Sequence, residues 1–159
     1  MRFITTLFLF GVTLFTACDD GGDSGLADGP GAYKADYRTS SAFFTQMAGR
    51  VLGNSPHGTS QIWYSSNIKS LVANTSFDVP VGTTAIKEFD MDGDGNLDGL
   101  AVMFKKDAGF DPTHGDWHYE MRGTSGDLMP DPAPGAIPMC VGCHTASAGT
   151  DYLAGTELR

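Results

Sequence analysis

The chain has 159 residues, with 19 acidic and 10 basic side chains and a formal net charge of −9 at neutral pH. This acidic balance argues against nucleic acid and anionic membrane surfaces as partners, and it is compatible with a basic partner protein. The length allows one small folded domain in addition to N-terminal segments.

Residues 1–17 are predicted to be an export signal. Arg2 gives a positive start, and the mostly apolar run that follows is too short to span a bilayer stably. The run ends in a Phe15-Thr16-Ala17-Cys18 segment that resembles the lipobox of bacterial lipoproteins, although Phe15 stands where Leu is usual. We therefore expect Cys18 to be acylated, so that lipid alone anchors the protein to the inner or outer membrane of a bacterial cell envelope. The alternative is an ordinary signal peptide with an incidental Cys18.

The next stretch, residues 18–32, is rich in Asp and Gly and has no apolar periodicity. It is predicted to be a flexible acidic tether that carries the lipid anchor. The folded domain is then expected over residues 33–159. At its start, several apolar residues recur near helical spacing, and a helix is predicted over residues 36–52. These residues are Phe43, Phe44, Met47, Val51 and Leu52.

Short β-strands are predicted for the middle of the chain, from β-branched and aromatic runs bounded by turn residues. The strands are expected at residues 61–64, 83–89, 100–106 and 117–122. One or two helical turns are expected over residues 66–73, and a loop over residues 123–137. Residues 90–99 are rich in Asp and Gly, and they are predicted to join two of the strands as an antiparallel hairpin.

Alternation along residues 83–89 assigns side chains to two faces of that strand. Thr84, Ile86 and Glu88 fall on one face. The other face carries Ala85, Lys87 and Phe89. The predicted fold class is α+β, with a small antiparallel sheet, flanking helices and a C-terminal cysteine attachment box.

That attachment box is the strongest motif in the chain. Cys140, Cys143 and His144 form a C-x-x-C-H segment, the pattern of covalent c-type haem. Two thiols at this spacing can add to the two vinyl groups of one porphyrin, and the adjacent His then becomes the axial iron ligand. A zinc half-site, a redox dithiol and a disulfide are the alternatives, but no second C-x-x-C completes a zinc site. With Cys18 assigned to lipid, all three cysteines have a role.

The hairpin loop carries a second motif. Asp90, Asp92 and Asp94, followed by Gly95, have the spacing of the first half of an EF-hand calcium loop. The position for the bidentate acid is Ala101, and strands rather than helices flank the loop. Calcium is therefore weighed against an acidic, solvated turn.

Several segments, in this order, resemble the cytochrome P-460 family, which includes the cytochromes c′-beta. The resemblance implies a mainly antiparallel β fold with flanking helices, and a homodimer. The segments are His57-Gly58, Ile62-Trp63-Tyr64, residues 81–88, residues 101–107, Gly115-Asp116-Trp117, the haem box and Thr150-Asp151-Tyr152.

Lys87 matches the position of the lysine that is covalently bonded to the porphyrin edge in hydroxylamine-oxidising members of this family. Such a bond distorts the macrocycle and changes its electronic properties. The alternative is an ordinary strand lysine with its ammonium group in solvent.

The catalytic members also carry a distal carboxylate as proton acceptor, whereas residues 100–104 contain no acid. Loss of that base is expected to slow hydroxylamine oxidation by about 100-fold or more. Glu88 alternates away from Lys87, and Asp98 and Glu120 are the remaining candidates. The c′-beta members instead cap the iron with aromatic side chains and bind nitric oxide, which makes Phe89 and Phe104 candidate caps. Core packing is the alternative for both residues.

The sequence thus predicts a lipid-anchored, mono-haem c-type cytochrome with an open iron site for nitric oxide or hydroxylamine, served by a redox partner protein. It leaves the assignment as an enzyme open. The alternative is an electron-transfer cytochrome with a six-coordinate haem. The candidate sixth ligands for that alternative are His57, His114, His118, Met103, Met121, Met129 and Met139.

Overall fold

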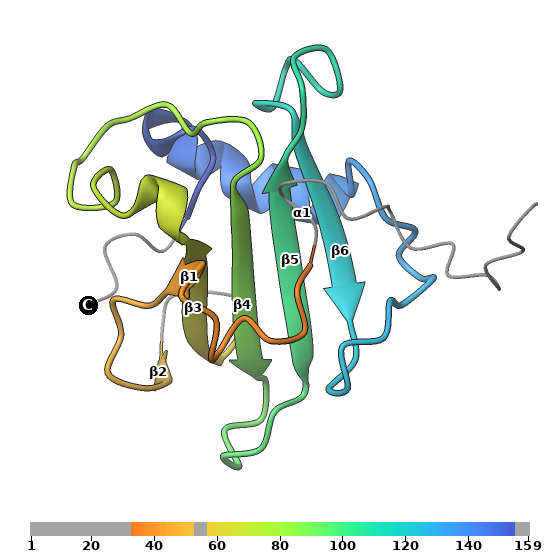
Figure 1. Cartoon of the computed structure of the whole chain (residues 1–159). Helices are drawn as coiled ribbons and strands as arrows, with labels where there is room; N and C mark the ends of the chain where they lie inside the picture. The colour runs from red at the N-terminus through yellow and green to blue at the C-terminus, as the bar shows by residue number, and fades with distance from the viewer. Residues whose placement is uncertain (1–32, 53–56, 155–159) are drawn as a thin grey trace, which may run out of the picture.

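The fold is built on one antiparallel β-sheet (Figure 1). The computed structural model describes residues 33–52 and 57–154. The sheet follows the order β1-β3-β4-β5-β6, and β2 also pairs with β3. One α-helix and two 3-10 segments, η1 and η2, complete the regular structure of these residues. The elements are β1 (Phe43–Phe44), β2 (Val51–Leu52), β3 (Thr59–Ser65), η1 (Ser66–Ile68), β4 (Thr84–Asp90), β5 (Gly99–Lys105), β6 (Trp117–Arg122), α1 (Pro138–His144) and η2 (Thr145–Thr150).

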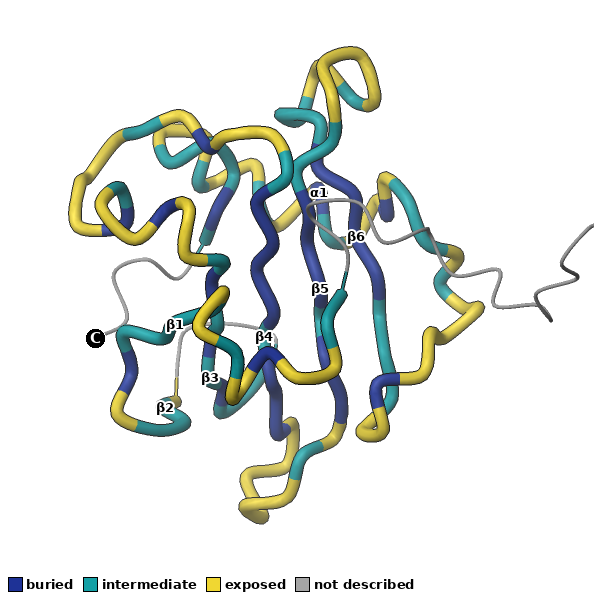
Figure 2. Tube along the Cα trace, viewed as in Figure 1, coloured by how far each residue is buried: buried dark blue, intermediate teal, exposed yellow. Residues whose placement is uncertain are grey.

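The β4–β5 hairpin forms the centre of the sheet. Lys87 pairs with Ala101 and Ile86 with Val102, in the antiparallel arrangement expected from the Asp/Gly-rich connection. Almost all of β4 and most of β5 are buried (Figure 2). Strands covered on both faces need apolar or fully hydrogen-bonded side chains at nearly every position, which these two strands provide.

Two hydrophobic clusters cover the two faces. One contains Tyr64, Met103 and Trp117 together with Val141 of α1, so α1 lies against this face, which we call the helix face. The other cluster contains Ile86 and Val102, and we call that side the far face. Strand alternation sends odd-numbered residues of β4 to the helix face and even-numbered ones to the far face, as predicted.

A buried carboxylate ties the far face together. Glu88 Oε1 accepts hydrogen bonds from Tyr37 Oη at 2.7 Å, Arg38 Nε at 2.6 Å and Trp63 Nε1 at 3.0 Å. The Glu88 side chain is only 4% exposed, while that of Arg38 is 51% exposed. The three donors compensate for the desolvation of the carboxylate and connect the N-terminal turn to β3 and β4.

The helix predicted over residues 36–52 is wrong. The structure has turns followed by β1 and β2, which both pair with β3. Phe43 packs against the far-face cluster and its neighbour Phe44 against the helix-face cluster, an alternation that only a strand provides. The segment is rich in Thr, Ser and Gly, which are weak helix formers. Main-chain hydrogen bonds to β3 therefore stabilise the two short strands more than the spacing of the apolar residues would stabilise a helix.

The remaining elements agree with the sequence more closely. The predicted strands are confirmed as β3 to β6, and the hairpin is confirmed. Residues 123–137 form a loop that is linked to β6 by isolated bridges and contributes Ile137 to the helix-face cluster. The α+β class holds, although within the described residues one short helix and two 3-10 segments replace the expected flanking helices.

The predicted signal peptide, the tether and Cys18 lie outside the described residues. Within residues 33–52 and 57–154, no helix combines the length and the apolar character needed to cross a membrane.

Removing the Glu88 carboxylate tests the far-face network. Glu88→Ala leaves the Arg38 guanidinium, the Tyr37 hydroxyl and the Trp63 indole without their acceptor, so we expect the free energy of unfolding to fall by about 3 kcal/mol. Urea denaturation followed by tryptophan fluorescence measures the change. Asp107→Ala, at an exposed carboxylate, serves as control and should change stability by less than about 0.5 kcal/mol. Equal stability of both variants would contradict a structural role for the network.

Candidate functional site

A cavity open to solvent lies between the helix face of the sheet and the C-terminal segment. The space between its walls is about 480 Å³, part of which is open to bulk solvent. The strands β3 to β6, the segment before β3, α1 and the residues after η2 all contribute to its wall. The lining residues are His57, Ile62, Ala85, Lys87, Ala101, Val102, Met103, Tyr119, Glu120, Met121, Cys140, His144, Leu153 and Ala154.

Strand register explains why the cavity exists. Two cross-strand rows run over the helix face, and each contains one alanine among larger side chains. Ala85 and Ala101 lie diagonally to each other on the central strands and have no bulk beyond Cβ. Packed interiors leave few voids, so two small residues at the centre of the sheet leave room for another group. The rows are Ile62, Lys87, Ala101, Met121 and Tyr64, Ala85, Met103, Tyr119.

His144 is held in one tautomer at the end of α1. Its Nδ1 lies 2.8 Å from the carbonyl oxygen of Tyr152, an acceptor only, so Nδ1 carries the proton and donates it. The other ring nitrogen, Nε2, is therefore the atom that can bind a metal. The Tyr119 ring packs edge-on against the His144 ring, with 5.5 Å between centroids.

The Tyr152 carbonyl is positioned by a tight backbone corner. Asp151 and Tyr152 adopt left-handed conformations, with φ of 51° and 64°. Trp117 Nε1 donates to the Asp151 carbonyl at 2.6 Å, and the Asp151 carboxylate accepts from the backbone N–H of Val79 at 2.9 Å and from Lys105 Nζ. Strands β5 and β6 thus fix the corner that orients His144.

The two cysteines share one side of α1 with His144. Positions three and four residues apart face the same way on a helix, so Cys140, Cys143 and His144 lie together. Cys140 is half-buried and lines the cavity, Cys143 is exposed, and both thiols are free. Burial raises the pKa of the Cys140 thiol, and the neighbouring Cys143 adds to the shift. The disulfide considered from the sequence is not formed.

The histidine and lysine side chains of the cavity form a group of nitrogen bases. Burial lowers the pKa of His57 to about 4, with smaller contributions from the charges of Lys87 and His144. Burial also lowers the pKa of His144, and the hydrogen bond to the Tyr152 carbonyl opposes that shift. Lys87 is half-buried and lines the cavity, a position different from that of a strand lysine exposed to solvent.

The two candidate aromatic caps separate in the structure. Phe89 lies on the helix face beside His57, with 5.6 Å between ring centroids. Phe104 belongs to the far-face cluster and stacks on His118 at 4.4 Å. Phe104 therefore cannot cover the cavity, because the sheet lies between them. The candidate cap at Phe104 is wrong, and the position of an even-numbered residue on β5 is the reason.

The other candidate residues also divide by face. Of the three histidines considered as sixth ligands, His57 lines the cavity, His118 lies on the far face, and His114 pairs with Asp111 in the loop before β6. Glu88 is on the far face, as predicted. Glu120 borders the cavity, but its carboxylate is bound by Arg122 at 2.8 Å.

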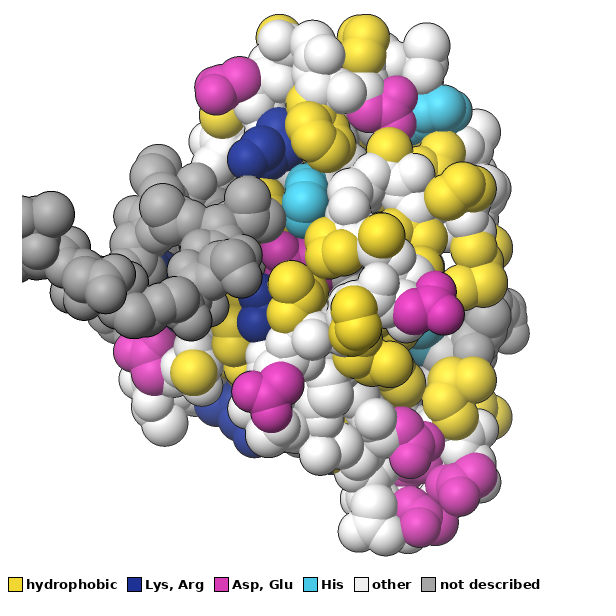
Figure 3. All heavy atoms as spheres, turned by 90° about the vertical axis from the view of Figure 1, so that its right-hand side faces the viewer, with side chains coloured by type: hydrophobic (Ala, Val, Ile, Leu, Met, Phe, Trp, Pro, Cys, Tyr) yellow, Lys and Arg dark blue, Asp and Glu magenta, His cyan; other side chains and the backbone are white. Residues whose placement is uncertain are grey.

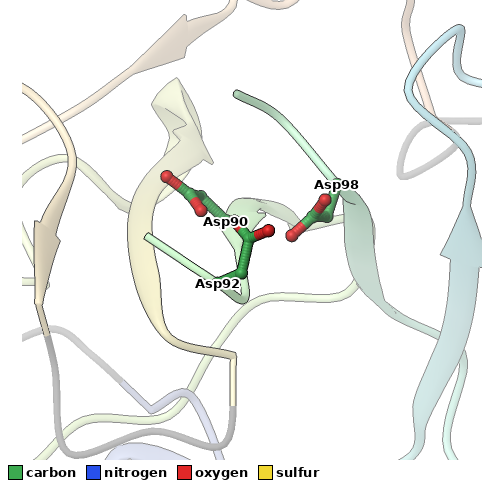
Figure 4. Close-up of side chains that lie close together, drawn as sticks. All are labelled: Asp90, Asp92 and Asp98. Carbon is green, nitrogen blue, oxygen red and sulfur yellow. The ribbon is translucent and has the colours of Figure 1, made fainter. Parts of the chain in front are cut away.

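The acidic hairpin loop brings together a set that differs from the predicted one. Asp90, Asp92 and Asp98 have carboxylate oxygens within 4.8 Å of one another (Figure 4). Asp94 instead accepts hydrogen bonds from Asn96, which lower the pKa of its carboxyl. Asp90 is buried and accepts from the backbone N–H groups of Gly93 and Gly95. Calcium binding here stays a prediction.

Sequence reasoning missed the contribution of Asp151, Tyr152, Trp117 and Tyr119 to the site. The pattern of the resemblance contained the first three, but nothing local showed that they meet His144. Backbone geometry and contacts across the sheet create that relation, and no motif spacing encodes it.

Neither a protein-family model nor a curated protein matches this chain. The function is therefore argued from the site itself.

The low pKa of His57 predicts a pH-dependent stability. The folded state holds His57 neutral down to about pH 4, whereas the unfolded chain protonates it near pH 6.5. The unfolded state thus binds more protons between these values, and the free energy of unfolding falls as pH drops from 6.5 towards 4. Urea denaturation of protein purified without a bound metal or cofactor measures this decrease. His57→Leu should have a shallower decrease over this interval; identical slopes would contradict the assignment.

Proposed function

We propose that this protein is a mono-haem c-type cytochrome resembling cytochrome P-460, anchored by lipid at Cys18, that binds nitric oxide or hydroxylamine at an open iron site. One observation carries the proposal. In a C-x-x-C-H segment bordering a cavity, His144 donates its Nδ1 proton to the Tyr152 carbonyl, which leaves Nε2 for iron.

The residues present fit covalently attached haem. Cys140 and Cys143 are free thiols on one side of α1 and would hold the porphyrin through thioether bonds. His144 has the tautomer and the fixed orientation of an axial ligand. The wall opposite α1 is mainly apolar, with Ile62, Ala101 and other small or hydrophobic side chains. Such a wall suits a large, flat, hydrophobic group.

Bound haem would supply an iron centre able to take a small ligand. The protein's own contribution is to orient His144, to exclude bulk water with an apolar wall and to place polar groups beside the ligand. Phe89 remains the aromatic candidate, because its ring lies beside that of His57, which lines the cavity. These features favour ligand binding or detoxification over efficient oxidation of hydroxylamine.

Efficient hydroxylamine oxidation is less well supported. Removing electrons from hydroxylamine also requires a base that removes protons. The Glu88 and Glu120 carboxylates are bound within far-face networks, and Asp98 accepts a hydrogen bond from Met91 in the hairpin loop. We therefore propose that any such enzymatic activity is weak.

Lys87 is proposed as the residue bonded to the porphyrin edge, as the family resemblance implies. Its place on the cavity wall, paired with Ala101 across the hairpin, supports this assignment. The small neighbour leaves the Lys87 side chain room to extend along the cavity.

A specific observation favours one form of the alternative function, electron transfer by a six-coordinate haem. His57 lines the same cavity as His144, whereas His114 and His118 do not. His57 is thus the histidine candidate for a sixth ligand. Met103 and Met121 also line the cavity and are the methionine candidates.

Partners follow from the same proposal. A redox partner protein would exchange electrons with the haem, and the exposed side chains of Leu128, Met129 and Met139 offer apolar contact area. Figure 3 shows hydrophobic side chains spread over one face of the molecule, with several acidic ones at its lower end. The homodimer, the location in the bacterial cell envelope and calcium bound by the hairpin loop remain further proposals.

Substitution of the attachment cysteines tests the haem directly. The matured protein, purified from cells that assemble c-type cytochromes, should give the pyridine haemochrome spectrum of haem with both vinyl groups saturated. Cys143→Ser should shift that spectrum towards one remaining vinyl group or lose the haem. Cys18→Ser, which removes only the lipid site, should keep the full haem spectrum. Matured wild-type protein without haem would overturn the proposed function.

Lys87→Ala tests the cross-link. The wild-type reduced Soret band should be broad and strongly shifted to the red, because the bond to Lys87 perturbs the porphyrin. Lys87→Ala should retain haem through its cysteines and show an ordinary c-type band. Lys69→Ala, which removes an exposed lysine, should match wild type. An unchanged spectrum in Lys87→Ala would show that no such bond forms.

A further inference from the structure

The corner of the chain at Asp151 and Tyr152 has a backbone conformation that these residue types do not favour. Both residues have left-handed φ values, 51° and 64°, and neither is glycine. The left-handed region is disfavoured for L-residues, and a bulky residue such as Tyr152 rarely adopts it. Such a conformation persists only where contacts with the rest of the structure enforce it. The contacts at this corner therefore decide where the Tyr152 carbonyl points.

An ion pair supplies the charged contact of the corner. Nζ of Lys105, on β5, lies 2.5 Å from Oδ2 of Asp151, and the two side chains are only 11% and 13% exposed. The same carboxylate oxygen accepts the backbone N–H of Val79 at 2.9 Å. Removing one partner of a buried ion pair leaves the other charge in a poorly solvated place, so such a pair is costly to break. Lys105 thereby fixes the Asp151 side chain.

Trp117 connects Lys105 to the backbone of the corner as well. Trp117 pairs with Lys105 across β5 and β6, and Lys105 Nζ lies over the indole, 5.5 Å from the ring centroid. The fully buried indole donates its Nε1 proton to the Asp151 carbonyl. Lys105 therefore contacts both groups that hold Asp151, the carboxylate directly and the carbonyl through Trp117.

The tautomer of His144 depends on this corner. A neutral imidazole keeps its proton on the nitrogen that has a hydrogen-bond acceptor, and the Tyr152 carbonyl is the acceptor for Nδ1. If the corner relaxed and this carbonyl turned away, the proton would be free to occupy Nε2. That is the nitrogen through which His144 would bind a metal.

We propose that Lys105 is a positioning residue for His144, because its ion pair with Asp151 holds the Tyr152 carbonyl against Nδ1 and so keeps Nε2 available as a ligand atom. Lys105 lies outside the set of described residues that line the cavity, so it acts through the corner and not by contact with a bound group. The inference rests on the proposed haem function, in which Nε2 binds iron, and adds to it a residue remote from the C-x-x-C-H segment.

The test measures how fast the Nδ1 proton of His144 exchanges with solvent, by NMR of matured full-length protein that contains isotopically labelled histidine. Exchange requires that the hydrogen bond to Tyr152 opens, so the rate reports on the corner directly. Lys105→Met removes the donor and its charge. Lys105→Gln keeps a hydrogen-bond donor without the charge, and Lys105→Arg restores the charge.

Two further variants are controls. Lys106→Met removes the same charge from the next residue, whose Nζ lies over the far-face ring of Phe104. Glu88→Ala lowers the stability of the whole domain from the far face without touching the corner. It separates the positioning of His144 from a general loss of stability.

We expect the exchange rate to rise about tenfold or more in Lys105→Met, the effect of losing hydrogen bonds made with a charged group. Lys105→Gln should show a smaller rise, and Lys105→Arg should stay within about threefold of wild type. Lys106→Met and Glu88→Ala should both keep the wild-type rate. If Lys105→Met does not fold, Lys105→Gln decides the test.

A wild-type exchange rate in folded Lys105→Met, or in Lys105→Gln where that variant decides, would overturn the inference. An equal rise in Glu88→Ala would overturn it too, because the rate would then follow stability and not the corner. Failure of the proposed function is a separate result, since matured wild-type protein would then contain no haem. The His144 proton belongs to the protein itself, so its exchange is measured in either case.

Discussion

The hydrogen bond from His144 Nδ1 to the Tyr152 carbonyl is the constraint on which the site depends. It forms because the chain turns sharply at Asp151 and Tyr152, and that turn is held by Trp117 and Lys105 from the sheet. Gly115 makes room for it, since a Cβ there would lie 2.6 Å from the Tyr152 ring. The C-terminal segment thus takes its geometry from strands formed much earlier in the sequence.

The two faces of the sheet serve different purposes. The far face carries the buried carboxylates of Glu88 and Glu120, each held by an arginine. The helix face has two alanines, Ala85 and Ala101, where packing would normally demand larger side chains. Two alanines bury less apolar surface than larger side chains would, which lowers the stability of the fold, and the hydrogen-bonded networks of the far face offset part of this loss. The stability contributed by the far face therefore allows a cavity on the helix face.

This division also sets the chemistry of the cavity. With both buried carboxylates held on the far face, the polar wall consists mainly of nitrogen groups, those of His57, Lys87 and His144. Burial lowers the pKa of the His57 imidazole, and the charges of Lys87 and His144 add to that shift.

Local patterns in the sequence were sufficient to predict the four main strands, the hairpin and the two faces of β4, because alternation and turn residues act over a few positions. The C-x-x-C-H segment could also be read directly from the sequence. Local patterns failed for residues 36–52, where pairing with β3 outweighs helical spacing, and for Phe104, whose face depends on the register of β5. Only the tertiary structure brought His57 to the cavity, separated it from His114 and His118, and placed the Tyr152 carbonyl against His144. Those relations join residues far apart in the chain through strand pairing and packing, and no local spacing records them.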